Sequence, residues 1–526
     1  MQYLPIIGLE IHIQLKTKSK MFCSCDNSGE DKAPNSTICP ICLGYPGVLP
    51  VINQKAIEWT VLMGLALKGK ISEFSRFDRK NYFYPDLPKG YQISQYDRPL
   101  VQAGYLELQT PQNEVRKIRI NRIHLEEDAA KLIHEVNYSE RIRFAQEKSH
   151  RKSYPLESED FTFIDFNRVG TPLLEIVTEP DICSSQEAKL FLQELRLIVR
   201  YLNISDAEME KGHLRCDANI SLNPVDEFGE LKGNLTPKTE IKNLNSFKAV
   251  ERALEYEIKR QTRLWQEGNP PKEQSTRGWD EDKGITIEQR KKEEAYDYRY
   301  FPEPDLPPLR NPDIEKIKLK MRELPQDKRR RFMEQYGFSS EETKILTEDR
   351  NLSYYTEQVI SELKAWLLSL EEVEGTEKEI WKKNKKQLVK LVANWLINKL
   401  GGLMTKENLK IKDLKITPEN FAEFITLIYQ NRISSFLGQK ILLKMFQTGT
   451  DPSNIITEES LEQVSEGEEL DKIIEEVIKG NPQVIQDFKK GKINALQFLI
   501  GQIMKQSRGR ANPKMVSEML KRRLEE

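Results

Sequence analysis

The sequence predicts an α+β protein, with a sheet in its N-terminal half and helices in its C-terminal half. Up to about residue 295, short segments of alternating apolar and polar residues are mixed with a few helical ones. After residue 312 the chain is rich in lysine and glutamate and has the periodicity of helices. Between the two halves lies RYFPEPDLPPLRNP, residues 299–312. Its prolines exclude a continuous helix and predict an extended linker.

The chain is long enough for several domains, each with a core of its own. Its 526 residues correspond to about two to four domains. We expect three, comprising residues 1–295, 296–408 and 409–526. Within the first, one helix should begin near Ser185, and another should follow Ser246 and end near a C-cap at Gly268. In the third, Thr417 is a candidate N-cap.

Composition bounds the location and the partners. No stretch approaches the roughly 18 apolar residues that a membrane span requires, and MQYLPIIGLE has no basic region or cleavage site of a signal peptide. We therefore expect no membrane partner and a cytoplasmic location, or an organellar stroma or matrix if the chain is organelle-encoded. The net charge of −1 does not indicate a nucleic acid, but residues 487–526 hold ten basic and four acidic side chains. The basic loop KQSRGRANPK in this segment is a reasonable phosphate-contacting element.

The opening segment GLEIHIQL predicts a strand with one apolar and one polar face. Apolar residues from Ile7 to Leu15 alternate with Glu10, His12 and Gln14. Side chains two residues apart share a face, so these three point the same way. On this strand alone, an ordinary solvated face would be the simplest interpretation.

Four further segments repeat this pattern, with carboxylates, amides, imidazole and cations on one face. The polar residues at alternate positions are Arg122, His124, Glu126 and Asp128; Glu175 and Glu179; Arg215, Asp217, Asn219 and Ser221; and Lys238, Glu240 and Lys242. Oxygen ligands suit Mg²⁺, and cations neutralise a phosphoryl group in transfer. The pattern fits either an ATP and Mg²⁺ cavity or several unrelated solvated faces. The segment GLALKGKI nearly matches the phosphate-binding P-loop motif, but Ile71 stands where the motif needs a Ser or Thr hydroxyl for Mg²⁺. Gly69 is better explained as a helix C-cap.

Four cysteines form two closely spaced pairs. In CSCDNSGEDKAPNSTICPIC, Cys23 and Cys25 are followed after thirteen residues by Cys39 and Cys42. Two such pairs can bring four thiolates to one tetrahedral Zn²⁺, with no open position for catalysis. The sequence therefore predicts a structural zinc knuckle, with free thiols as the alternative. Cys183 and Cys216 are expected to be ordinary buried thiols.

With these motifs in view, the chain closely resembles the GatB family, the B subunits of the aspartyl/glutamyl-tRNA(Asn/Gln) amidotransferases. The resemblance covers nearly the whole chain and many motifs in order. In the first half these are IGLEIHIQL, KMFCSC, NSTICPICLGYPGVLPV, RKNYFYPDLPKGYQISQYD, RIHLEEDA, IDFNRVGTPLLEIVTEPDI, LRCDANISL, EIKNLNSF and DYRYFPEPDLPPL. In the second half they are ANWL, ITPENFAEF and FLIGQIMKQSRGRANP. Ala130 stands where the family usually has glycine, which suggests that no positive φ is demanded there.

The resemblance implies a fold and an activity. It implies a glutamine synthetase-like antiparallel catalytic sheet, the cradle, followed by an all-α helical domain and a YqeY-like helical tail domain that binds tRNA. It implies ATP-dependent phosphorylation of the side-chain carboxylate of misacylated Glu-tRNA(Gln), and of Asp-tRNA(Asn), and then amidation by ammonia. The ammonia would come through a channel from a glutaminase, the amidase (A) subunit, in a heterotrimer that a small C subunit completes.

The resemblance also implies roles for particular residues. Glu10, His12 and Glu126 are assigned to Mg²⁺ and to the region where ammonia enters. Lys80 would line the ammonia route or touch phosphate, the alternative being an ordinary surface lysine. Weaker assignments, to the nucleotide and metal wall, are Asp128, Glu175, Asp217, Asn219, Glu240 and Lys242.

Two other functions stay open at the level of sequence. The chain could be a non-catalytic tRNA-binding scaffold, or a glutamine synthetase-like ligase for a small carboxylate. The scaffold leaves the charged strand faces without a task, and the small-molecule ligase leaves the basic tail without one. ATP hydrolysis that depends on Glu-tRNA would separate the three.

Overall fold

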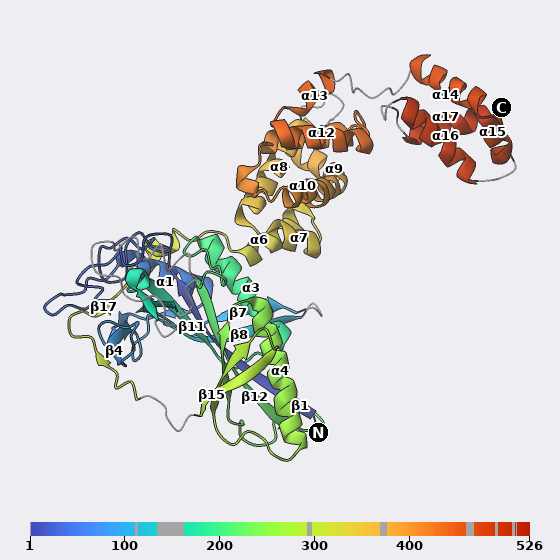
Figure 1. Cartoon of the computed structure of the whole chain (residues 1–526). Coiled ribbons are helices and arrows are strands. Elements are labelled where there is room, and N and C mark those ends of the chain that lie inside the picture. The colour runs from blue at the N-terminus through green and yellow to red at the C-terminus, as the bar shows by residue number, and fades with distance from the viewer. Residues whose placement is uncertain are drawn as a thin grey trace, which may run out of the picture. The chain divides into compact units, whose positions relative to one another are not determined.

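The computed structural model describes residues 2–110, 114–133, 162–291, 297–368, 376–458, 468–489, 493–507, 511 and 513–525. The chain forms two compact units, Met1–Leu324 and Pro325–Glu526 (Figure 1). The first unit is built on a sheet and the second consists of helices, so the α+β class expected from the sequence is confirmed. The division into three domains with boundaries after residues 295 and 408 stays a prediction. Among the described residues, no helix is both long and apolar enough to cross a membrane.

One large mixed sheet organises the first unit. Its pairings are antiparallel except between β13 and β14, which run parallel. In spatial order the strands are β15 (Ile285–Lys291), β14 (Ser275–Asp280), β13 (Thr239–Leu244), β12 (Leu214–Val225), β1 (Gln2–Gln14), β11 (Pro172–Thr178), β8 (Val115–Glu127), β6 (Val101–Gln102) and β2 (Lys70–Ile71), with β7 (Tyr105–Gln109) also paired to β8.

Helices cover one face of this sheet. They are α1 (Gln54–Ala66), α3 (Ser185–Leu202) and α4 (Phe247–Gln266), and α3 and α4 lie side by side (Figure 1). The short α5 (Ile314–Lys318) packs against α1. The alternation in β1 buries Ile7, Leu9, Ile11 and Ile13 in the core shared with these helices. The expected helices are confirmed: Ser184 Oγ accepts the N–H of Glu187, Ser246 Oγ accepts that of Ala249, and Gly268 follows α4 with a φ of +73°.

The end of α1 explains the apparent P-loop. The left-handed residue there is Lys68, with a φ of 56°, so Gly69 is not the residue that needs positive φ. Gly69 instead lies one residue further on, where its N–H donates to Gly64 O at 2.8 Å. A Cβ at Gly69 would lie 2.6 Å from Val101 Cγ1, so glycine is required by close packing. The segment GLALKGKI therefore ends helix α1, whereas a P-loop would precede a helix. This agrees with the incomplete match to the P-loop motif.

The proline-rich segment is extended, but it is more than a linker. Its strand β16 (Phe301–Pro302) pairs with β4 (Asp78–Asn81), which also pairs with β5 (Tyr91–Ser94). Its strand β17 (Leu309–Arg310) pairs with β3 (Phe74–Ser75). Proline is tolerated on such edge strands because no ladder hydrogen bond from its nitrogen is needed. The first unit consequently continues to Leu324. A further small pair, β9 (Lys131–Ile133) and β10 (Phe163–Asp165), precedes a 3₁₀ turn at Phe166–Arg168.

The second unit contains two hydrophobic cores. One joins helices from Phe332 to Ile456, and the other lies among the last four helices, from Leu470 to Leu524. Thr417 caps α11 as expected, since its Oγ accepts the N–H of Asn420. The helices are α6 (Pro325–Arg331), α7 (Ser340–Leu346), α8 (Arg350–Leu368), α9 (Glu377–Ala393), α10 (Gly401–Lys406), α11 (Pro418–Tyr429), α12 (Ser435–Thr448), α13 (Pro452–Glu458), α14 (Glu468–Gly480), α15 (Pro482–Lys489), α16 (Ile493–Gln506) and α17 (Pro513–Glu525). Phe332–Tyr336 and Asn394–Leu400 are π-helical, and Ile411–Asp413 is a 3₁₀ turn.

Candidate active site

Strand register gathers polar side chains at the centre of the sheet, on the face opposite the helices. On β1, Glu10 is paired with Asp217 of β12, and His12 is paired with Glu175 of β11. Glu175 is in turn paired with His124 of β8. Directly paired residues of neighbouring strands point to the same face and lie close together. The polar faces that the sequence predicts separately are therefore one continuous surface.

His12 lies at the middle of three carboxylates. Its Nε2 is 3.8 Å from Glu10 Oε1, 3.7 Å from Glu126 Oε1 and 3.5 Å from Glu175 Oε2. His124 Nε2 lies 3.1 Å from the same Glu175 oxygen. Glu126 and Glu175 are only 3% and 6% exposed. Because unpaired buried carboxylates are costly, this cluster of Glu10, His12, His124, Glu126 and Glu175 needs positive charge nearby.

Protonation of His12 supplies part of that charge. Burial opposes a proton on His12, but the hydrogen bond and charge of Glu175, with Glu126 and Glu10, raise its pKa to about 9. Burial likewise opposes charge on Glu175, yet His124 and His12 hold its pKa well below the usual value. The pKa of Glu10 is raised by burial and by Glu175.

The same groups fit a divalent cation. One ligand atom from each of Glu10, His12 and Glu175, and likewise from His124, Glu126 and Glu175, lies within 4.8 Å of the others. Two ligands each about 2.1 Å from one ion are themselves about 3–4 Å apart, and His12 Nε2 lies at such distances from Glu10, Glu126 and Glu175. Within the described part of the chain, the buried Nδ1 of His124 has no hydrogen-bond partner. Carboxylate oxygens with one or two imidazoles suit Mg²⁺ or Mn²⁺.

Lys80, on β4, lies beside this cluster. Its Nζ is 4.9 Å from the ring centre of Tyr298 and 6.0 Å from that of Tyr82. Burial disfavours its charge, but Glu126, Tyr300 and Glu175 raise its pKa above the ordinary value. A lysine held as an ammonium ion against buried carboxylates is suited to contact a phosphate or a carboxylate substrate.

A second group of charges lines the sheet on the other side of β1. Lys242 Nζ lies 3.0 Å from Asp217 Oδ2 and 3.3 Å from Glu240 Oε1. Thr276 of β14 donates to Glu240 Oε2 at 2.9 Å. These side chains are therefore paired with one another, and Asp217 is near enough to Glu10 to raise its pKa.

A pocket opens next to Glu10. It has a volume of about 740 Å³, which is in the range of small-molecule sites. It begins at Gly8 and Glu10 and continues along Asn219 and Ser221 of β12. Three cationic residues, Arg122, Lys238 and Lys272, also line it. Cations around a pocket that ends at a candidate metal site suit a phosphate-bearing ligand.

Asp128 has a different environment from the other predicted acidic residues. Its Oδ2 accepts hydrogen bonds at 2.8 Å from both Arg215 and Gln14, and Arg168 lies 3.8 Å away. Burial acts against its charge, but the two arginines and these bonds lower its pKa. Asp128 thus holds Arg215 and the end of β1 in place, and it belongs to neither candidate metal group found among the described residues.

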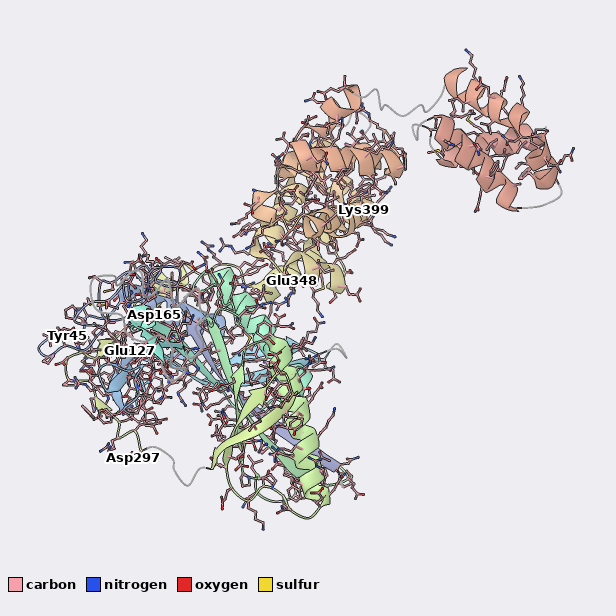
Figure 2. All side chains as sticks on the ribbon, viewed as in Figure 1. Tyr45, Glu127, Asp165, Asp297, Glu348 and Lys399 are labelled. Atoms are coloured by element: carbon pink, nitrogen blue, oxygen red, sulfur yellow. The ribbon has the colours of Figure 1, made fainter. Side chains whose placement is uncertain are left out.

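The cysteine centre has the geometry expected from the sequence. The four Sγ atoms of Cys23, Cys25, Cys39 and Cys42 lie within 4.8 Å of one another, so this cluster can hold a metal ion. The fully buried Lys20 places its Nζ 4.0 Å from Cys42 Sγ, and the N–H of Cys39 donates to the same sulfur at 3.1 Å. Such donors favour thiolates, as in a metal-bound state. Tyr45 and Glu127, both labelled in Figure 2, line a small cavity that Cys23 and Cys42 also line. Elsewhere, Cys216 is buried as expected, whereas Cys183 is half-buried.

Several contributors have no role assigned from the sequence. His124 and Arg122 lie on the polar face predicted for their strand, and that alternation could have marked them. Tyr298 directly precedes the segment 299–312, which the sequence predicts to be a linker. Lys272 lies in the loop between α4 and β14, where the sequence has no helical or strand periodicity. Glu179 lies beyond the end of β11, where Asn121 donates to it at 2.7 Å, so it does not join Glu175. Ala130 is not among the residues with positive φ, as its departure from glycine indicates.

Together the fold and the site define an α+β protein with a candidate metal and phosphate site on a mixed sheet, a tetracysteine centre and a helical second unit. Comparison with known proteins is more specific. Residues 5–315 match the GatB/GatE catalytic domain, and residues 378–524 match the GatB domain. The chain belongs to the GatB family, and the resemblance seen in its motifs is confirmed.

Relatives match over the full length. The aspartyl/glutamyl-tRNA(Asn/Gln) amidotransferase B subunit of Carboxydothermus hydrogenoformans is 43% identical over 528 residues, covering 99% of each chain. The corresponding B subunits of Thermotoga maritima and Thermodesulfovibrio yellowstonii are 41% and 44% identical, each covering 100% of both chains. The chain is therefore similar to the B subunits of these amidotransferases along its whole length.

Proposed function

We propose that the chain is the amide-forming B subunit of a tRNA-dependent amidotransferase. Its substrates would be misacylated Glu-tRNA(Gln) and Asp-tRNA(Asn), ATP and ammonia, and its products Gln-tRNA(Gln) and Asn-tRNA(Asn). The observation that carries this proposal is the partly buried cluster of Glu10, His12, His124, Glu126 and Glu175, flanked by Lys80 and by a cationic pocket. The sheet that bears it would serve as a glutamine synthetase-like cradle, acting in the cytoplasm.

The proposed reaction has two steps. A side-chain carboxylate oxygen attacks the γ-phosphorus of ATP, the bond to the bridging oxygen breaks, and ADP leaves. Ammonia then attacks the acyl carbon of the resulting acyl phosphate, inorganic phosphate leaves with the electrons of the C–O bond, and the nitrogen loses one proton. Activation is needed because a carboxylate oxygen is otherwise a poor leaving group.

The residues of the site suit these steps. Arg122, Lys238 and Lys272 would neutralise the phosphates of ATP in the pocket beside Glu10. Lys80 would orient the substrate carboxylate and balance its charge before transfer. Glu10, His12 and Glu126, with Glu175, would hold Mg²⁺, which when bound stabilises the charge on a transferring phosphoryl group. Asp217, Asn219, Glu240 and Lys242 form the remaining wall, and Asp128 keeps Arg215 in place.

Metal and partners follow from the same reasoning. We assign structural Zn²⁺ to Cys23, Cys25, Cys39 and Cys42, because four thiolates complete a tetrahedral site. Since the relatives are named as one lettered component of an amidotransferase, we expect a heterotrimer with an amidase (A) subunit that supplies ammonia and a small C subunit. The YqeY-like tail domain, expected to comprise residues 409–526, would bind the tRNA.

Two other functions are less well supported. In a non-catalytic scaffold, carboxylates as buried as Glu126 and Glu175 would cost folding free energy without a use. A ligase for a small carboxylate would leave the basic segment 487–526 without a role.

The test is conversion of Glu-tRNA(Gln) by the complex reconstituted with its amidase and small subunits. ATP, Mg²⁺ and ammonium chloride are supplied, so that activity does not depend on the glutaminase. We expect conversion by the unmodified chain. The control variant Glu107→Ala should also convert the substrate, since Glu107 lies on β7 and pairs with Lys117. Glu10→Ala should lose it. Absence of conversion with the unmodified chain and active partners would leave the scaffold as the better explanation.

A further inference from the structure

A group of tyrosines continues outward from Lys80. The rings of Tyr96 and Tyr300 are stacked, with centroids 4.0 Å apart and planes inclined by only 8°. Tyr298 meets Tyr300 edge-on at 6.0 Å and Tyr82 at 5.9 Å, and its own ring lies 4.9 Å from Lys80 Nζ. Tyr96 is 59% exposed. An unbroken aromatic surface therefore leads from the half-buried Lys80 to solvent.

This surface is held rigidly. Arg79 donates from Nε and from one terminal nitrogen to the two carboxylate oxygens of Glu303, at 2.7 and 2.8 Å. The Glu303 side chain is fully buried, and the pair fastens β16, next to Tyr298 and Tyr300, onto β4. On the other side, the buried carboxylate of Asp78 accepts the N–H of Tyr96 at 3.0 Å. A ligand that stacks here does not have to order the rings, which lowers the entropy cost of binding.

The aromatic group and the cationic pocket lie at different ends of the carboxylate cluster. Glu10 of β1 and Arg122 of β8 are both paired with Val177 of β11, so they lie at the same position along the sheet. Both residues line the pocket. Gln14 of β1 and Glu126 of β8 are both paired with Leu173 of β11. Glu126 therefore lies beside a position of β1 that is four residues beyond Glu10, a distance of roughly 14 Å along the strand. Lys80 lies at this second end: it pairs with Gln92, whose amide donates to Glu127 O at 2.7 Å. The cluster thus has one approach from the pocket and another from the tyrosines.

The proposed substrate makes a specific demand on the second approach. Its reacting carboxylate is part of an amino acid that is esterified to the ribose of the terminal nucleoside of an RNA. An extended glutamyl group spans roughly 7 Å from ester oxygen to carboxylate, given bonds of about 1.5 Å. The base of that nucleoside must consequently bind just outside the cluster. Bases of single-stranded RNA ends bind chiefly by stacking on aromatic side chains.

We propose that the stacked pair of Tyr96 and Tyr300 is the platform for the terminal adenine base of the aminoacylated RNA. The pair lies on the Lys80 side of the cluster, whereas the pocket with Arg122, Lys238 and Lys272 is left for ATP. With the base on Tyr96, the esterified amino acid extends past Tyr298 to Lys80. The inference rests on the proposed function, which it deepens by naming a binding site for the RNA end.

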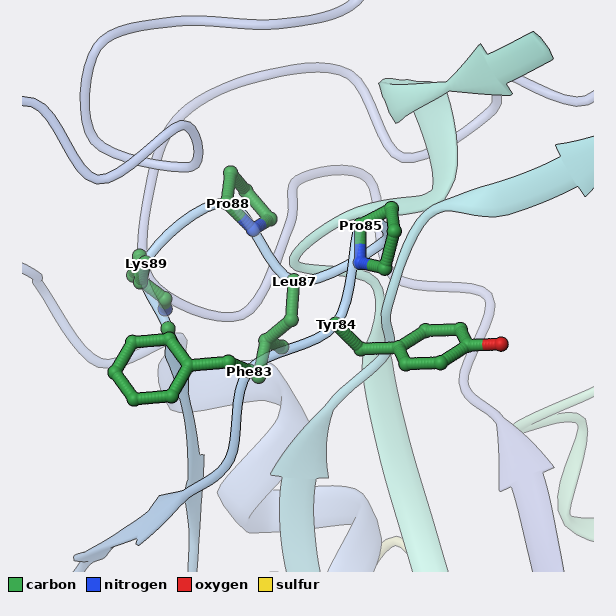
Figure 3. A pocket seen from close by; sticks show the side chains of 7 residues that line it. Phe83, Tyr84, Pro85, Leu87, Pro88 and Lys89 are labelled. Atoms are coloured by element: carbon green, nitrogen blue, oxygen red, sulfur yellow. The ribbon is translucent and has the colours of Figure 1, made fainter. Parts of the chain in front are cut away.

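The neighbouring loop is not part of this platform. After Tyr82, it presents Phe83 and Tyr84 to opposite sides (Figure 3), so that one base cannot contact both. The Phe83 ring instead lies over Gly90, where a Cβ would be 2.9 Å from the ring. Among the described aromatic pairs of this region, Tyr96 and Tyr300 are the two whose rings are stacked face to face.

The experiment compares full-length tRNA with tRNA that lacks its terminal adenosine, in binding to the complete complex. The variants are Tyr96→Leu and Tyr96→Phe, with Tyr300→Leu as a second test and Phe228→Leu as control. Phe228 is 83% exposed and lies between β12 and β13. We expect Tyr96→Leu to weaken binding of the full-length tRNA by about 5- to 150-fold, the usual effect of losing one base stack. It should leave the truncated tRNA and the affinity for ATP unchanged. Tyr96→Phe and Phe228→Leu should behave as the unmodified chain.

The other outcomes each overturn the inference in a different way. Equal weakening of both tRNAs would mean that Tyr96 contacts another part of the tRNA. Weakened ATP binding alone would mean that the platform holds the adenine of ATP. Loss of an amidase or small subunit from the complex would identify the tyrosines as a protein interface. Because binding is measured without turnover, a failed amidation assay is distinguishable from a failed platform.

Discussion

The buried pair of Arg79 and Glu303 should control the local stability of the segment that carries Tyr298 and Tyr300. In Glu303→Gln, Arg79 loses the charge of a fully buried partner but keeps Asp305, 3.1 Å away. Removal of one member of a buried ion pair costs about 3–5 kcal/mol. Since the Arg79 side chain is 19% exposed and Asp305 stays, we expect about 3 kcal/mol, the lower end of that range.

Hydrogen exchange measured by mass spectrometry reports this loss directly. If residues 298–310 open locally, a cost of about 3 kcal/mol corresponds to roughly 150-fold faster exchange of their amides. Asp206→Asn is the matched control, because it removes the exposed pair with Lys16, whose side chains are 58% and 37% exposed. Exposed pairs contribute about 0–1 kcal/mol, so exchange should hardly change. Unchanged protection of residues 298–310 in Glu303→Gln would refute the idea that this pair fastens β16.

Three other predictions concern the metal centre, a titrating glutamate and the tail. Purified protein should contain one zinc per chain by elemental analysis, and Cys39→Ser should lose it while Cys216→Ser keeps it; absence of zinc from the unmodified chain would contradict the knuckle. Glu423 has a pKa raised to about 7 by burial and by Asp451, so its stabilising effect is fully present below about pH 4.5 and is lost as the pH rises through 7. Glu423→Gln should therefore raise the melting temperature at pH 8.5 but not at pH 5, and an equal shift at both would exclude titration as the cause. Deletion of residues 459–526, which removes the last core without disturbing the one before it, should weaken tRNA binding and spare ATP turnover at saturating tRNA; loss of that turnover would contradict a binding role for the tail.

The polar face was predictable because strand alternation is a local property. Ile7 to Leu15 fixed which side of β1 would be buried, and the positions of Glu10 and His12 on the other side followed. The same rule placed Glu126, Asp217 and Glu240 on their strands. The cysteine centre was predictable for a similar reason, since two short spacings determine which four thiols can meet.

The pairing of these strands with one another was not predictable from the alternation of apolar and polar residues. The pairing of His12 with Glu175, and of Glu175 with His124, depends on strand order and register across long stretches of chain. The tyrosines beside Lys80 come from segments around residues 82–96 and 298–300 that no local pattern connects. The solvated face considered from the sequence also proved inadequate, because Glu126 and Glu175 lie almost out of contact with water. Proline content correctly indicated an extended segment after Arg299, but it gave no sign that the segment adds an edge strand.

The charge balance of the site explains why one sheet face can serve two substrates. Glu10, Glu126 and Glu175 repel one another, and the fold offsets this with His12, His124 and Lys80. Burial and the charge of Glu175 raise the pKa of Glu10, and the cationic pocket opens on this side of the cluster. Towards the other end of the cluster, Glu126 is the carboxylate that acts most strongly on Lys80. A phosphate group with its cation is therefore best accommodated on the Glu10 side, and a carboxylate substrate on the Lys80 side. Transfer of the phosphoryl group requires the phosphate and the carboxylate to approach the cluster from opposite ends. Arg122 and Glu126, four residues apart on β8, mark these two ends.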